Sequence, residues 1–177
     1  MSRATMTLHD ATVPSFLQTL EAMQGILERG LSHCRESGLD PAELVETRLA
    51  PDMHPLRFQV ISVAHHSATA LQGVMTGNFT GPPDLGPLDY PALQALIAEA
   101  RAKVQAVTPE QLNGAADGVV NFPVRDRVMR FVGADFLLSF SVPNFYFHVS
   151  TTYAILRMKG VGLGKRDYLG KLRLKAD

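Results

Sequence analysis

The sequence has one cysteine, no tryptophan and no excess of either charge among its 177 residues. A lone cysteine, Cys34, cannot form an intrachain disulfide, which favours a reducing compartment. Lys plus Arg and Asp plus Glu each number 17, so the chain lacks the basic field that attracts nucleic acid or an anionic membrane. We therefore expect no nucleic-acid and no membrane partner. Net neutrality leaves self-association into a homodimer open.

Two further absences concern targeting. The first residues contain no apolar run of the kind found in a secretory signal peptide. The most apolar stretch, residues 136–156, is interrupted by Asn144, His148 and several hydroxyl side chains, so we interpret it as a core helix and not as a membrane span. These features favour a cytoplasmic protein, and the length suits a single domain over residues 1–177.

Apolar residues recur at helical spacing in four long segments, which we place at residues 13–35, 55–75, 89–107 and 134–159. We expect Thr12 to cap the first of them. Residues 77–87 are dense in glycine and proline and predict a connecting loop. The sequence thus predicts a mostly all-α fold, a four-helix bundle.

Residues 118–132 differ from the rest, because β-favouring side chains partly alternate there. We expect a small β-hairpin before the last helix. Arg125, Arg127 and Arg130 lie in it and are compatible with an anion patch, but a solvated hairpin face is the simpler interpretation.

Several motifs carry a resemblance to a known family: PNFYFHV at 143–149, TYAILR at 152–157, GLGKRDYLG at 162–170, PDM at 51–53 and FQV at 58–60. With them, nearly the whole chain resembles a bacterial family of uncharacterised proteins in the DinB/YfiT-like superfamily. That resemblance implies an antiparallel bundle of up-down-down-up order and often a homodimer. The superfamily includes metal-dependent thiol S-transferases and a maleylpyruvate isomerase.

The resemblance also implies where a metal would bind. The usual site has one histidine on the second helix and a His-x-x-x-His pair on the last, whose members share a helix face. Here the pair reads Asn144-x-x-x-His148. An amide oxygen is a poor ligand for zinc or nickel, so any divalent metal, Zn or Ni, would have to bind at an altered site.

On the second helix, His65 shares a stripe with Phe58 and Ile61, and we expect it to point into the bundle. We expect the adjacent His66 to face solvent or a subunit contact, although the resemblance does not choose between the two. His65 and His148 are therefore the candidate metal ligands. The alternative for His148 is a buried ring satisfied by a hydrogen bond to Asn144 or a hydroxyl.

Pro143 interrupts the last helix and predicts a kink that opens a small polar pocket. We expect its lining to include Asn144, His148, His65, Asp52 and Gln59. Asp52 would either orient a histidine ring or cap the second helix.

Three functions stay open on these grounds. The first is a metal-binding or small-ligand-binding protein with a degenerate histidine site. The second is a non-catalytic homodimeric binding or scaffold protein without metal. The third is a metal-dependent thiol S-transferase or isomerase.

Overall fold

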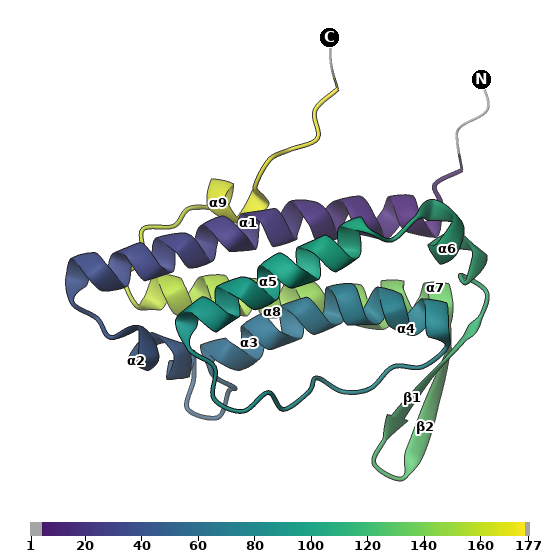
Figure 1. The fold of residues 1–177 in the computed structure, drawn as a ribbon, viewed down its shortest axis with the longest axis horizontal. Coiled ribbons are helices and arrows are strands. Elements are labelled where there is room, and N and C mark those ends of the chain that lie inside the picture. Colours follow the sequence, from purple (N-terminus) through teal and green to yellow (C-terminus); the bar gives the residue numbers. More distant parts are fainter. Residues whose placement is uncertain (1–4, 176–177) are drawn as a thin grey trace.

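The computed structural model describes residues 5–175 and is mostly helical, with one small antiparallel sheet (Figure 1). The elements in chain order are α1 (Leu8–Ser37), α2 (Pro41–Glu46), α3 (Leu56–Ala64), η1 (His65–Thr69), α4 (Ala70–Thr76), α5 (Tyr90–Gln105), α6 (Pro109–Gly114), β1 (Val119–Val124), β2 (Arg127–Val132), α7 (Gly133–Asp135), η2 (Phe136–Ser141), α8 (Val142–Met158) and α9 (Lys165–Leu169). The four long segments expected from the sequence are present, with ends shifted by a few residues. No helix within the described residues is long and apolar enough to span a bilayer.

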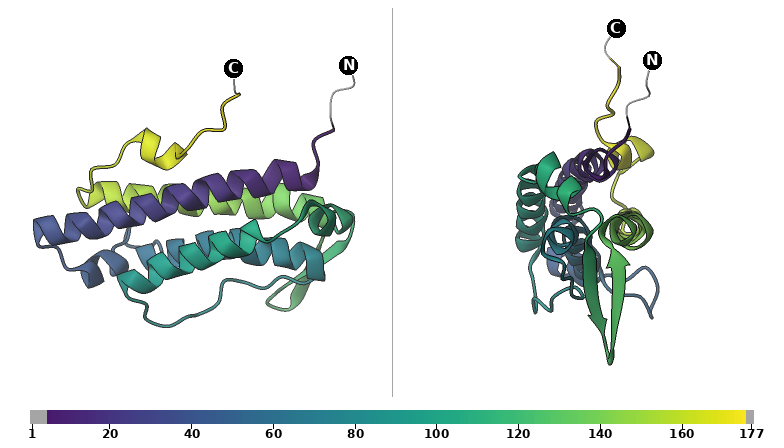
Figure 2. Two further views of the ribbon diagram at one scale, coloured as in Figure 1. Left: turned by 45° about the horizontal axis from the view of Figure 1, so that its top comes forward. Right: turned by 90° about the vertical axis from the view of Figure 1, so that its right-hand side faces the viewer.

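The long helices lie side by side, as the end-on view in Figure 2 shows. Hydrogen bonds and an ion pair between the helices show their directions: α5 runs antiparallel to α1, and α8 runs antiparallel to the continuous segment formed by α3, η1 and α4. The pairs that show this are Leu27–Tyr90, Glu21–Arg101, Gln59–His148 and His66–Ser141. The connection from residue 77 to residue 89 runs along the outside of α3 (Figure 1).

The core lies between these helices and contains the apolar stripes read from the sequence. Phe16 of α1 meets Phe145 of α8 with ring centroids 4.8 Å apart. Cys34 is buried in the same core. At Gly30 the helices α1 and α5 approach closely, because the hydroxyl of Tyr90 donates to the carbonyl oxygen of Leu27 at 2.9 Å.

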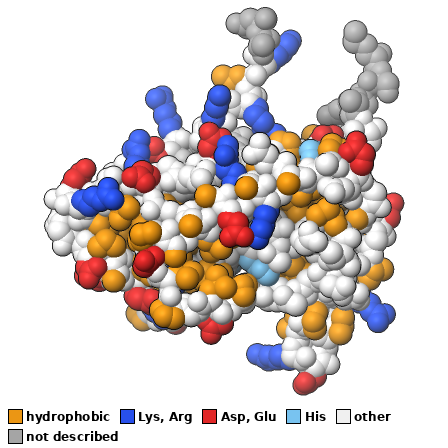
Figure 3. Space-filling view, in the orientation of Figure 1, with side chains coloured by type: hydrophobic (Ala, Val, Ile, Leu, Met, Phe, Trp, Pro, Cys, Tyr) orange, Lys and Arg blue, Asp and Glu red, His pale blue; other side chains and the backbone are white. Residues whose placement is uncertain are grey.

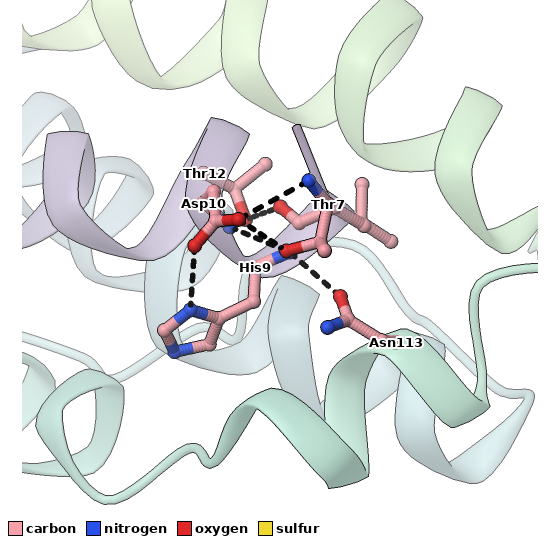
Figure 4. Close-up of polar contacts among 6 residues, drawn as sticks. Thr7, His9, Asp10, Thr12 and Asn113 are labelled. Carbon is pink, nitrogen blue, oxygen red and sulfur yellow. Dashed lines mark hydrogen bonds and ion pairs between the residues drawn. The ribbon is translucent and has the colours of Figure 1, made fainter. Parts of the chain in front are cut away.

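The first helix begins at Leu8, earlier than the sequence predicted. Thr7 is the N-cap and forms a capping box with Asp10 (Figure 4), which satisfies backbone N–H groups of the first turn. Thr12 lies inside the helix and donates to the carbonyl oxygen of Leu8. The prediction of Thr12 as the cap was therefore wrong. Asn113 of α6 accepts from the backbone N–H of His9 and ties α6 to this end of α1 (Figure 4).

Both helices that carry the candidate site contain a π-helical turn, η1 in the second long segment and η2 before α8. A π-turn inserts one extra residue, changes which side chains share a face, and is frequent at functional sites. The sequence predicted a kink at Pro143. The structure has a π-turn just before this residue, and Pro143 itself lies in the first turn of α8. The two π-turns contact each other through Ser141, whose hydroxyl donates to the carbonyl oxygen of His66 at 3.0 Å.

The hairpin forms as expected, with Val119 opposite Val132 and a two-residue turn at Arg125 and Asp126. Arg125 has φ 52°, the left-handed conformation that such turns require. The hairpin extends away from the helices (Figure 1), and Arg125, Arg127 and Arg130 are exposed on it.

Candidate functional site

Two histidines meet where the π-turn η1 faces α8. The rings of His66 and His148 have centroids 5.8 Å apart and planes only 9° from parallel. His66 is 4% exposed and His148 9% exposed. The prediction that His66 faces solvent or a subunit contact was therefore wrong, because the side chain is buried within the single chain.

The tautomer of His148 follows from its partner. Gln59 of α3 donates its amide N–H to the carbonyl oxygen of His54 at 2.9 Å, which fixes the amide orientation. Its Oε1 must therefore accept from Nδ1–H of His148, at 2.8 Å. Neutral His148 then carries its lone pair on Nε2.

The same reasoning assigns His66. The hydroxyl hydrogen of Ser141 is used on the carbonyl oxygen of His66, at 3.0 Å. The Ser141 oxygen is left to accept, so Nδ1 of His66, 3.3 Å away, is the protonated nitrogen. Both rings of the pair thus hold their hydrogen on Nδ1 and a lone pair on Nε2. Second residues that orient an imidazole in this way are typical of histidines that bind something through the other nitrogen.

Burial keeps the pair uncharged. It lowers the pKa of His66 to about 3, with smaller contributions from His65 and His148, and it lowers the pKa of His148 to about 4. Both rings are therefore neutral at physiological pH, with their Nε2 lone pairs available.

Those lone pairs are open to a partner. Within residues 5–175 neither Nε2 atom has a hydrogen-bond partner, and neither atom is completely buried. Ser62, three residues after Gln59 on α3, is completely buried, and its hydroxyl has no partner among the described residues. Phe58, Phe140 and Phe147 surround the pair, with ring centroids 5.2–6.0 Å from one or other imidazole.

His65 lies elsewhere. Its Nε2–H donates to the carbonyl oxygen of Thr80 at 2.8 Å, which ties the connection between α4 and α5 to η1. Burial lowers the pKa of His65. The sequence prediction paired His65 with His148, whereas the structure places His66 beside His148 and turns His65 toward α5.

The other predicted site residues differ in whether they contact His148. Gln59 does contact it. Asn144 is half-buried and donates its side-chain N–H to the carbonyl oxygen of Phe140 at 2.7 Å, so it is not the partner of His148. Asp52 is exposed; the cap of α3 is Pro55, and no histidine contacts the carboxylate among the residues described. The missed signal was a polar stripe, Gln59, Ser62 and His66, at helical spacing.

The residues do not fit the three-histidine metal centre that the resemblance implied. Among the described residues no group of three or more His, Cys, Asp or Glu side chains is placed to hold a metal ion. The side-chain N–H group of Asn144 bonds to the backbone, and its amide nitrogen offers no lone pair that could join the two imidazoles as a metal ligand. Two imidazoles alone are one short of the three protein ligands that catalytic zinc sites use.

Comparison with known proteins agrees with the fold. The structure is similar to the crystal structure of a DinB family member protein from Shewanella denitrificans, with a TM-score of 0.77 and 26% identity over 96% of each chain. The molecule is thus a DinB-like, mostly helical protein. Residues 8–169 match the domain of unknown function DUF1993, and the chain belongs to that family. The resemblance read from the motifs is confirmed. No curated protein matches the chain significantly.

Proposed function

We propose that this chain is a small-ligand-binding protein on an antiparallel four-helix bundle of the DinB/YfiT type. Its binding group is the His66–His148 pair. The observation that supports this most is that Gln59 and Ser141 hold both Nδ1 hydrogens, which leaves two neighbouring Nε2 lone pairs without a partner. Two uncharged acceptors suit a small molecule that carries N–H or O–H donors.

The geometry favours binding over catalysis. A general base works best when its pKa lies near the operating pH, and the pKa of His148 is lowered to about 4. A metal-dependent transferase or isomerase would need a third protein ligand, which the described residues do not supply. No reaction step is therefore assigned to the pair.

The test follows the histidine nitrogens directly. Ring ¹⁵N shifts of the protein, recorded with and without small primary amides, amines and alcohols, should report Nδ1–H tautomers for both rings. One class of these probes should shift the Nε2 resonances of both. His66→Phe and His148→Phe should each abolish that response, and His33→Phe, a matched change on α1, should leave it intact. If both rings carry the hydrogen on Nε2, the proposal fails.

A zinc titration of the same variants is a separate measurement. We expect the His66–His148 pair to bind zinc more weakly than three-histidine sites do. Tight binding of one zinc per chain, lost in either variant, would replace the small-molecule proposal by a metal site at the same pair.

A homodimeric scaffold is the second candidate, supported by exposed apolar side chains. Leu138 of η2 is 50% exposed, Phe147 of α8 is 55% exposed, and Val128 of the hairpin is 55% exposed. Exposed apolar side chains of this size would be covered in a dimer. Light scattering at micromolar concentration would support this candidate if it gave twice the chain mass. A monomer would exclude it.

A further inference from the structure

A cavity lies where η1 faces α5. It has a volume of about 180 Å³ and adjoins a larger hollow of about 480 Å³, with which it shares Ala68, Thr69 and Lys103. Figure 3 views this face, where hydrophobic side chains gather around a histidine and a pair of opposite charges.

The floor of the smaller cavity is apolar and built from small residues. Ile61, Ala64 and Ala100 line it and are 4–7% exposed, and Leu96 adds a half-buried side chain. Alanine on both facing helices leaves the space that longer side chains would fill. An apolar cavity of about 150 Å³ holds one benzene molecule, so a space of this size accepts a single aromatic ring.

One histidine adds a polar group to this lining. His65 lines the cavity and is 4% exposed. Because its Nε2–H donates to the Thr80 carbonyl oxygen, the lone pair of the neutral ring is on Nδ1. Within the described part of the chain Nδ1 has no hydrogen-bond partner, and it is not among the fully buried atoms that lack one. Nδ1 is therefore an unpaired and partly accessible nitrogen on a side chain that lines the cavity.

The rim adds no net charge. Glu99 and Lys103, one turn apart on α5, both line the cavity and form an ion pair at 2.7 Å. Burial also lowers the pKa of His65, so the ring stays neutral. A charged ligand would find no unpaired opposite charge among the lining residues.

We propose that this cavity is a binding site for a phenol: one apolar ring on the alanine floor, with one hydroxyl donating to Nδ1 of His65. The connection between α4 and α5 adds Pro83 and Leu85 to the lining, and the bond from His65 to Thr80 holds that connection in place. The adjoining hollow gives room for a substituent on the ring. This site is independent of the His66–His148 pair.

The test is an NMR titration with phenol, matched by toluene, which has the same shape without the donor. Phenol should shift the backbone amides of Ala64, Ala68 and Lys103. It should also move ¹⁵Nδ1 of His65 toward the range of a hydrogen-bonded nitrogen. Because one net hydrogen bond is worth about 0.5–1.5 kcal/mol, toluene should bind up to about tenfold more weakly. Equal affinities would overturn the role of His65, and the absence of shifts would overturn the site.

Variants complete the test. Ala68→Leu fills the space shared by both cavities and should remove phenol binding. Ala98→Leu, the same change on the exposed face of α5, should not. If Ala68→Leu does not fold, Leu96→Phe fills the smaller cavity from the other helix and serves the same purpose. Retained binding in a folded cavity-filling variant would overturn the proposal. His148→Phe should bind phenol normally, so failure of the proposed function leaves this result unaffected.

Discussion

His148 donates Nδ1–H to Oε1 of Gln59 across the contact between α8 and α3, at 2.8 Å. Gln59 is itself held by the carbonyl oxygen of His54. The short chain of bonds determines which nitrogen of a buried ring is free. It also makes Gln59 the residue through which the candidate site is oriented.

Gln59→Leu keeps the side-chain size but removes both bonds. It leaves Nδ1–H of His148 buried without an acceptor, so we expect a loss of about 1–3 kcal/mol in the free energy of unfolding. The ring should also populate the Nε2–H tautomer, visible in ¹⁵N spectra. Gln72→Leu, an exposed position on α4, is the control and should change stability by less than about 0.5 kcal/mol. An unchanged tautomer in Gln59→Leu would show that the bond does not orient the ring.

Acid should destabilise the protein through the same pair. The unfolded rings titrate near 6.5, whereas the pKa of His148 is about 4 and that of His66 about 3 in the folded chain. The unfolded state therefore binds protons first, and the stability present above pH 6.5 falls as the pH drops toward 4 and then 3. For His148 alone the difference amounts to roughly 3 kcal/mol at most. Urea unfolding across this range should give a flatter profile for His148→Gln than for the unchanged chain. Parallel profiles would contradict the lowered pKa.

Gly30 is required by the approach of α1 to α5. A Cβ at this position would lie 2.2 Å from the Tyr90 hydroxyl oxygen, so Gly30→Ala should destabilise the chain by about 1–3 kcal/mol in thermal or urea unfolding. Tyr90→Phe in the same chain should recover part of the loss, because the clashing oxygen is gone. Gly25→Ala is the matched control: the space around it is open within 4 Å, and it should stabilise α1 by about 0.5–1 kcal/mol. Equal effects of the two alanines would show that the close approach is absent in solution.

Asn144→His restores the His-x-x-x-His pattern of the resembled family on α8. With His66 and His148 it would supply a third imidazole, so zinc should now stabilise the protein. At a zinc concentration 100 times the Kd the gain is about 2.7 kcal/mol, or roughly 5–10 °C in Tm. The unchanged chain and Ser150→His, a substitution on the exposed face of α8, should show little shift. A zinc-induced rise as large in the unchanged chain would mean that two histidines suffice.

Chelation gives a complementary measurement on the unchanged chain. Because the described residues offer no third metal ligand, EDTA should leave the Tm of the purified protein within about 1 °C. A larger fall, restored by zinc, would identify a bound metal that stabilises the fold.

Much of the fold could be predicted from the sequence because it depends on local patterns. Apolar spacing located the long helices, and alternation located the hairpin. A buried His148 was one of the two interpretations that the sequence left open, and the ring is 9% exposed. Errors at helix ends, such as Thr12 for Thr7, arose because several residues near a start can cap it. Only the full set of bonds decides which one does.

The sequence alone therefore determined the mostly helical class and the family resemblance, and it indicated His148 of the last helix as a candidate site residue. Which histidine of the second helix faces His148 was decided by the tertiary structure. Consecutive residues on a helix point about 100° apart, and a π-turn at the same place shifts the facing side chains, so periodicity does not separate His65 from His66. The free nitrogens were likewise beyond the sequence. They depend on Gln59, Ser141 and Thr80, which the fold brings from 15 to 89 residues away to hydrogen-bond with the three rings.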